Sequence, residues 1–182
     1  MAKTYPAIGP FAPGDILTAA TMTNIDTNLE NQRVPPMVKC LRSTSDQTGI
    51  ATGSATNLQW NAEAFDTDTM HDNVTNNDRI TFGTAGAYVV TGSARITFGG
   101  TLSLAQASIR QTTSGVTTVR VGFYQPQAQS TVVIISMQAV VSAAVNDYVT
   151  FTIEALTGAT GTISHTAVDQ AYFSALWVGQ TA

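Results

Sequence analysis

The side chains best suited to chemistry are two histidines and a scattered set of carboxylates. His71 and His165 are the histidines of the chain, and a hydrolase of the triad type would need one of them beside a nucleophile and an orienting carboxylate. Ser164 precedes His165, but adjacent residues of a strand point to opposite faces. No Gly-Xaa-Ser-Xaa-Gly segment is present. We therefore expect both histidines to lie in exposed turns, and we expect no catalytic residue and no enzymatic activity.

Three aspartates, Asp66, Asp68 and Asp72, lie close together and are followed by further Asn and Asp residues. Calcium prefers several oxygen ligands of this kind, but Met70 and His71 stand where a calcium loop of the EF-hand type needs a ligand and a glycine. Asp and Asn also occupy ordinary turns. No phosphate-binding, dinucleotide-binding or zinc-protease motif is present. We predict no metal site and no cofactor, with an ion at the Asp66 loop as the alternative.

The composition excludes several other classes of function. Only 11% of the residues are charged and the net charge is −4, so the chain lacks the basic face that a nucleic-acid partner requires. The most apolar stretch, Thr131–Val145, is interrupted by polar residues, and we expect no membrane insertion. The start has no apolar segment typical of a secretory signal, so we expect synthesis in a cytoplasm. Cys40, the single cysteine, is expected to be a small buried residue.

The periodicity divides the chain into an arm, residues 1–36, and a head, residues 37–182. Prolines and glycines fill the start of the arm, and Thr18–Arg33 then reads as one short amphipathic helix. Thr18 or Asp15 could cap the helix, and the prolines that follow Val34 end it. One such helix cannot form a core of its own. The arm is therefore either disordered or packed on a partner.

In the head, apolar residues alternate with polar ones in many short runs. Ala87–Phe98 and Tyr148–Ala155 each place an apolar face opposite a polar one. Further runs are Met37–Arg42, Leu58–Trp60, Arg79–Phe82, Leu102–Arg110, Val116–Phe123, Thr131–Val141 and Tyr172–Val178. Gly, Asn, Asp and Ser clusters separate them. The pattern predicts an all-β jelly-roll sandwich of about ten antiparallel strands.

Two of these runs, Thr131–Val141 and Tyr172–Val178, are apolar on both faces. One face of an antiparallel sheet normally meets water, so the second apolar face needs another cover. A neighbouring copy of the chain is the simplest cover, with the chain's own loops or arm as the alternative. The second faces comprise Val132, Ile134, Val140, Tyr172, Leu176 and Val178. We predict that these residues form a subunit interface.

The order of segments in the head resembles the globular head of complement first component q and the tumour-necrosis-factor superfamily. The matching segments are Phe65–Thr67, Arg79–Phe82, Gly86–Val90, Ala144–Val149 and Tyr172–Leu176. Asn146 and Ala175 depart from the pattern, which usually has glycine at both positions. The resemblance implies a ten-stranded jelly roll that assembles into a trimer.

The arm carries a second resemblance. Gly14 to Ile25 is similar to the leader Gly-Xaa-Xaa-Leu-Thr-Ala-Xaa-Xaa-Met-Asn that opens many tailed-bacteriophage virion proteins. It implies an arm that attaches to the virion, with major capsid or tail proteins as partners. The apolar residues available for attachment are Ile16, Leu17, Met22, Ile25 and Leu29.

Aromatic residues offer an alternative role in binding a host-surface glycan. The candidates are Trp60, Phe65, Phe123, Tyr124 and Trp177. Phe123, Tyr124 and Gln125 are expected where a strand runs into a loop, a frequent place for recognition residues.

The sequence thus favours a non-enzymatic protein of the virion surface, a trimeric capsid-decorating or head-fibre-like module anchored by its arm. A receptor-binding tip or lectin-like module, and a minor tail or baseplate component, are the alternatives.

Overall fold

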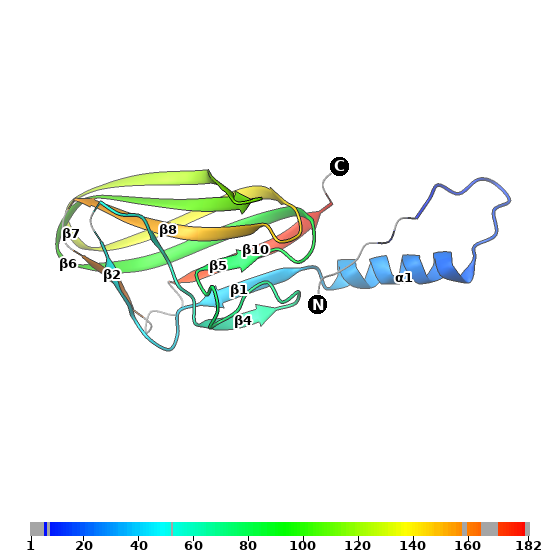
Figure 1. Ribbon diagram of the computed structural model, residues 1–182, viewed down its shortest axis with the longest axis horizontal. Helices are drawn as coiled ribbons and strands as arrows, with labels where there is room; N and C mark the ends of the chain where they lie inside the picture. Colours follow the sequence, from blue (N-terminus) through cyan, green and yellow to red (C-terminus); the bar gives the residue numbers. More distant parts are fainter. Residues whose placement is uncertain (1–5, 7, 52, 158–159, 165–170, 181–182) are drawn as a thin grey trace.

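The protein is an antiparallel β structure preceded by one helix (Figure 1). The computed structural model describes residues 6, 8–51, 53–157, 160–164 and 171–180, with side chains for all of these except 100–105, 123–131 and 155–157. The elements are α1 (Ala19–Arg33), β1 (Met37–Leu41), β2 (Gln47–Ile50), β3 (Thr56–Asn57), β4 (Ala62–Asp66), β5 (Arg79–Thr81), β6 (Gly86–Thr113), β7 (Val116–Ala143), β8 (Tyr148–Thr157), β9 (Gly161–Ile163) and β10 (Tyr172–Gly179).

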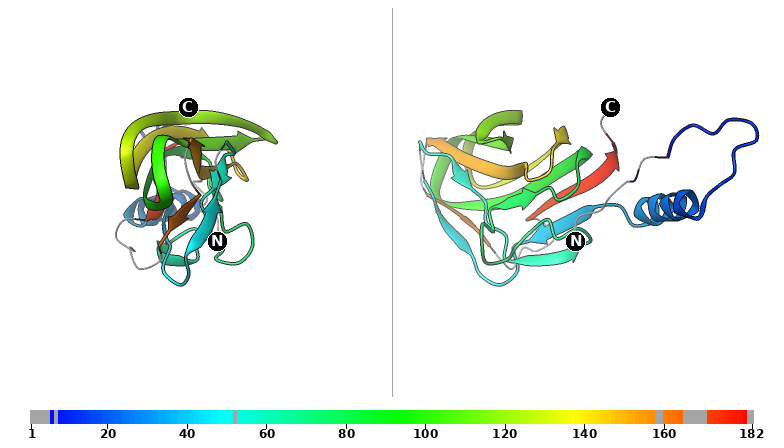
Figure 2. Two further views of the ribbon diagram at one scale, coloured as in Figure 1. Left: turned by 90° about the vertical axis from the view of Figure 1, so that its left-hand side faces the viewer. Right: turned by 45° about the vertical axis from the view of Figure 1, so that its right-hand side comes forward.

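Two long strands, β6 and β7, pair with each other almost throughout and belong to both layers of the fold. The first part of β6 lies between β7 and β10, and β1 and β4 continue this layer beyond β10. The last part of β6 lies between β7 and β8, and β8 also pairs with β3 and β5. The views in Figures 1 and 2 show the two layers facing each other. The predicted jelly-roll sandwich is therefore confirmed.

The lengths of β6 and β7 differ from the prediction. The expected strands Leu102–Arg110, Val116–Phe123 and Thr131–Val141 are parts of these two strands, which have 28 residues each. The pairing of β6 with β7 shifts register between Thr97 and Leu104, where the sequence contains Gly99. Glycine in a strand often marks a bend rather than an end. The pattern of glycine and polar residues was therefore misinterpreted as a break between strands.

A tight turn joins β6 to β7. Ser114 and Gly115 both have positive φ, 50° and 81°, and they connect Thr113 to its pairing partner Val116. A two-residue turn with this geometry matches the right-handed twist of the strands that it joins. Glycine adopts such a φ without strain, whereas serine does so at some cost.

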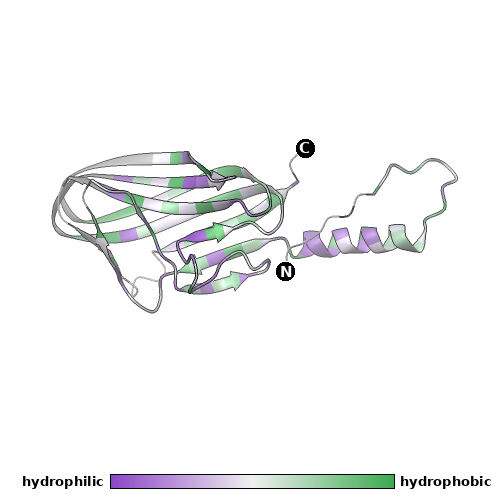
Figure 3. Ribbon diagram, viewed as in Figure 1, coloured by the Kyte–Doolittle hydropathy of each residue, from purple (hydrophilic) through white to green (hydrophobic). Residues whose placement is uncertain are grey.

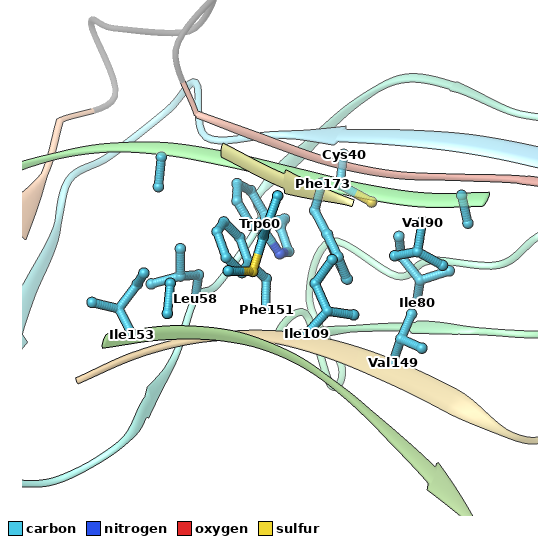
Figure 4. Close-up of a cluster of buried hydrophobic side chains, with 14 of the residues drawn as sticks. Cys40, Leu58, Trp60, Ile80, Val90, Ile109, Val149, Phe151, Ile153 and Phe173 are labelled. Atoms are coloured by element: carbon cyan, nitrogen blue, oxygen red, sulfur yellow. The ribbon is translucent and has the colours of Figure 1, made fainter. Parts of the chain in front are cut away.

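The core lies between the two layers (Figure 4). Phe173 is central, with its ring 5.9 Å from that of Trp60 and 6.0 Å from that of Phe151. Cys40 is fully buried, as predicted, and burial raises the pKa of its thiol far above the usual range. Trp60 is equally buried, so it cannot serve as the sugar platform considered above.

Helix α1 begins where the sequence predicts. The Thr18 hydroxyl accepts the backbone N–H of Thr21 at 3.2 Å, an N-cap. Pro35 and Pro36 follow the C-cap Val34 and prevent continuation. The helix projects from the head and contains no buried residue (Figure 1). Within the residues that the structure describes, no helix is both long and apolar enough to cross a bilayer.

The connection between α1 and the head is held by hydrogen bonds. The Pro36 carbonyl accepts the backbone N–H of Trp177 at 2.9 Å, and the Pro35 carbonyl accepts the Thr67 hydroxyl at 2.7 Å. Within the helix, Asn28 donates from Nδ2 to the Pro6 carbonyl at 3.0 Å. The direction of α1 is therefore coupled to the end of the head where β1 starts and β10 finishes.

Candidate self-association face

The outward face of β7, β6, β10 and β1 carries a continuous row of apolar side chains. Val140 pairs with Val89, Val89 with Leu176, and Leu176 with Met37. Neighbouring strands are about 4.8 Å apart, so these four side chains adjoin one another. Val140 and Leu176 are 70% and 44% exposed. We call Met37, Val89, Val140 and Leu176 the apolar row.

The next positions on the same face are mostly polar. Gln138, Thr91, Ser174 and Lys39 form the adjacent row across the same strands. The Lys39 ammonium lies 5.0 Å from the centre of the Tyr172 ring, a cation–π contact. Ser93 and Ser136 face each other one row further, with their hydroxyl oxygens 2.9 Å apart.

A shallow hollow of about 430 Å³ lies over β1 and β10 on this face. Met37 and Leu176 line one part of it, and Lys39, Tyr172 and the 44% exposed Phe65 line another. The hollow therefore offers apolar surface with a single cation. Such a surface suits packing against another protein better than bond-making chemistry.

All six predicted interface residues are on the outward side of their strands. Val133, Ile135, Phe173 and Ala175 alternate with them and are buried in the core. Ile134 is 54% exposed. The predicted residues are Val132, Ile134 and Val140 on β7 and Tyr172, Leu176 and Val178 on β10. Their role in an interface stays a prediction.

The sequence analysis missed Met37 and Val89, the other half of the apolar row. Val89 shares its strand face with Thr91, Ser93 and Arg95, so the period-two pattern identified that face as polar. Only the pairing of β6 with its two neighbours shows that Val89 lies between Val140 and Leu176.

The arm presents a second apolar surface. Asp15 folds its tip: the backbone N–H of Ala12 donates to Asp15 Oδ2 at 2.6 Å, and the Asp15 N–H donates to the Ala12 carbonyl at 3.1 Å. Gly14, at φ 94°, allows this turn. Phe11 and Ile16 flank the turn and are exposed, Ile16 by 88%. Phe11 was not among the predicted attachment residues.

The role of the predicted attachment residues stays a prediction, but the structure shows their exposure. Leu17, Met22 and Leu29 are exposed, and Ile25 is partly exposed. We call Phe11, Ile16 and Leu17 the arm tip. Met22, Ile25 and Leu29 lie on α1.

The prediction that the candidate ligand residues lie where a strand runs into a loop is wrong. Phe123, Tyr124 and Gln125 lie within β7 and pair with Ala107, Gln106 and Ala105 of β6. The strand continues beyond them, and Pro126 pairs with Leu104. The side chains of Phe123, Tyr124 and Gln125 are outside the described part, so their ligand role stays a prediction.

His71 is buried, contrary to the expected exposed turn. Its Nδ1 lies 2.9 Å from Glu63 Oε1, and its Nε2 lies 3.4 Å from the Asn77 carbonyl. The pair joins β4 to the following loop, a structural role. His165 lies outside the described residues.

Asp66 and Asp72 of this loop accept hydrogen bonds from the backbone. The Asp66 carboxylate accepts the N–H groups of Asp68, Met70 and His71 at 2.7–3.0 Å. The Asp72 carboxylate accepts those of Thr75 and Val74, which lowers the pKa of Asp72. Among the residues that the structure describes, no three His, Cys, Asp or Glu side chains converge as metal ligands would.

Two layers that share β6 and β7, with β1, β10 and β4 completing one of them, define a jelly roll of the complement-q and tumour-necrosis-factor type. The solved globular domain of zebrafish complement 1qA has a similar structure, with a TM-score of 0.59 and 14% identity over 80% of this chain and 98% of that one. The crystal structure of murine APRIL at pH 5.0 is also similar, with a TM-score of 0.60 and 10% identity over 79% of this chain and 98% of that one. These likenesses show the fold. No family model and no curated sequence matches the chain.

Proposed function

We propose that the chain is a trimeric structural protein of a tailed-phage virion, of the capsid-decorating or head-fibre type, held on the particle surface by its N-terminal arm. The observation that carries the proposal is the apolar row on the outward face of the head. Removing apolar surface from water yields about 25 cal/mol per Å². A second copy is the simplest cover for a row that runs across four strands.

The proposal of three copies in the assembly rests on the similarity in fold. The row lies on the layer built from β4, β1, β10, β6 and β7. The family that the sequence resembles forms compact trimers, and the fold of this chain is that of the family. Three copies placing this layer toward a common axis would cover the row in each.

The arm supports attachment to a larger scaffold. It extends away from the head, and its tip exposes Phe11, Ile16 and Leu17. These residues surround a turn that is stabilised by a hydrogen bond from the Ala12 N–H to the Asp15 carboxylate. A preformed turn loses little conformational freedom on binding, so its apolar side chains contribute more to affinity. The similarity of Gly14 to Ile25 to phage virion leaders makes a capsid or tail protein the proposed partner.

The test is incorporation into particles of the phage that encodes the chain. We expect the triple variant Phe11→Ser, Ile16→Ser, Leu17→Ser to keep its mass in solution but to be depleted at least tenfold from purified particles, measured by quantitative mass spectrometry. The matched control is Val74→Ser with Val116→Ser, since both valines are exposed on the head, away from the arm.

The control should be incorporated like the wild type. Particles that never contain the wild-type chain would refute the virion role. Equal incorporation of the tip variant would refute attachment by the arm tip.

A further inference from the structure

Helix α1 has an apolar stripe in which Met22 and Leu29 are exposed and Ile25 is partly exposed. Met22, Ile25 and Leu29 follow one another at spacings of three and four residues and therefore share one face. No residue of the helix is buried, and Leu29 is 59% exposed. Most of the other residues of the helix are polar, and Figure 3 colours much of α1 as hydrophilic.

The folded-back arm lies on a different side of the helix. Its contact is the hydrogen bond from Asn28 to the Pro6 carbonyl, and a hollow between arm, helix and head is lined by Asn28 and Gln32. Successive residues of a helix are about 100° apart, so Asn28 is well away from Leu29 but follows Ile25 by three residues and lies next to it on the helix surface. The arm therefore borders the stripe at Ile25, which is partly exposed, and leaves Met22 and Leu29 exposed.

The spacing of the stripe is that of a coiled coil. With Met22 at the first core position of a heptad, Ile25 takes the second and Leu29 the first of the next heptad. Leucine at the first core position with isoleucine at the second favours assemblies of more than two helices over dimers. The stripe thus fits copies of itself, in a number compatible with the proposed trimer.

The connection to the head places the helices correctly for this. Val34 to Pro36 lead directly from α1 to Met37, which is one end of the apolar row. The Pro36 and Pro35 carbonyls are bound by Trp177 and Thr67, so the helix cannot swing freely. If the rows of three heads meet at one axis, three α1 helices start from the same end of that trimer, parallel and close together.

We propose that α1 is a second self-association element, in which the Met22, Ile25 and Leu29 stripes of three copies pack into a short parallel coiled coil. This inference rests on the proposed trimer of heads. It reassigns these three residues from virion attachment to contacts between copies. The arm tip remains the part that meets the virion.

Helix formation is then coupled to assembly. A solitary helix of 15 residues is marginally stable in water, because most helical stability in proteins comes from packing of an apolar face. Three copies that share their stripes supply this packing.

The test uses the full chain with one added cysteine. Ile25→Cys places a thiol in the stripe, and Thr27→Cys places one on the far side of the same helix. Wild type is the blank, since Cys40 is buried. After light scattering has established the mass, each variant is oxidised mildly and examined on a non-reducing gel. We expect Ile25→Cys to form covalent dimers at least tenfold faster than Thr27→Cys.

A second pair of variants reports on helicity. We expect Ile25→Asp to reduce the helical circular dichroism at 222 nm and Thr27→Asp to leave it unchanged, with the head folded in both. A trimer in which Ile25→Cys and Thr27→Cys cross-link equally slowly, and Ile25→Asp stays helical, would overturn the coiled coil and leave the trimer of heads standing. A wild-type chain that is monomeric would overturn both.

Discussion

Val140 is the residue on which the trimer can be tested most directly. Its side chain is 70% exposed, so Val140→Asp leaves the fold of the single chain intact. In a trimer the new carboxylate would be buried without a partner, at a cost of about 2–5 kcal/mol. We expect light scattering at micromolar concentration to show monomers.

Val116 provides the matched control for this substitution. It is also a valine, 67% exposed, but it lies beside the turn between β6 and β7 and outside the apolar row. Val116→Asp should leave the mass unchanged. Trimers that persist in Val140→Asp would exclude the apolar row as the interface.

Single residues also show what an interpretation from sequence leaves undetermined. The Asp66 carboxylate accepts the backbone N–H groups of Asp68, Met70 and His71, which the residue types alone did not indicate. His71 was expected in water and is buried against Glu63. Both outcomes depend on how the loop after β4 folds back, which the residue types do not reveal.

Gly92 of β6 lies directly against the ring of Phe151 from β8. A side chain there would bring its Cβ to 2.8 Å from the Phe151 ring, and Phe151 is fixed by stacking on Phe173. Gly92→Ala should therefore lower the free energy of unfolding by about 1–3 kcal/mol through overpacking. Urea denaturation measures this change.

Gly122, in β7, is the control glycine. A Cβ at this position would have its nearest neighbour, Val119, at 3.7 Å, an ordinary contact. Gly122→Ala should be neutral or slightly stabilising, because alanine loses less backbone freedom on folding. If both substitutions changed the free energy of unfolding equally, close packing against Phe151 would not explain why position 92 is a glycine.

For the whole molecule, the trimer predicts a thermal midpoint that depends on protein concentration. Assembly stabilises the folded state by mass action. For a trimer of chains of this size, a hundredfold rise in concentration should raise the midpoint on the order of 5 °C. Differential scanning calorimetry of the wild type and of Val140→Asp measures this shift. The variant should show a midpoint that does not change with concentration, and a constant wild-type midpoint would contradict assembly.

Much of the fold followed from local patterns. Thr18 and the prolines after Val34 predicted the limits of α1. The period-two alternation separated buried Val133 from exposed Ile134. These features depend on neighbours along the chain, where backbone geometry dictates which side chains share a face.

Contacts between distant segments required the three-dimensional arrangement. The apolar row joins Met37, Val89, Val140 and Leu176 from four strands, and no local pattern indicates which of these valines and leucines become neighbours. The burial of His71 and the continuity of β7 through Phe123 and Tyr124 are of the same kind. Strand pairing register links residues far apart in the chain, and a shift by one residue would turn every side chain to the other face. Local alternation therefore determined which residues point outward, whereas the register determined which outward residues form one surface.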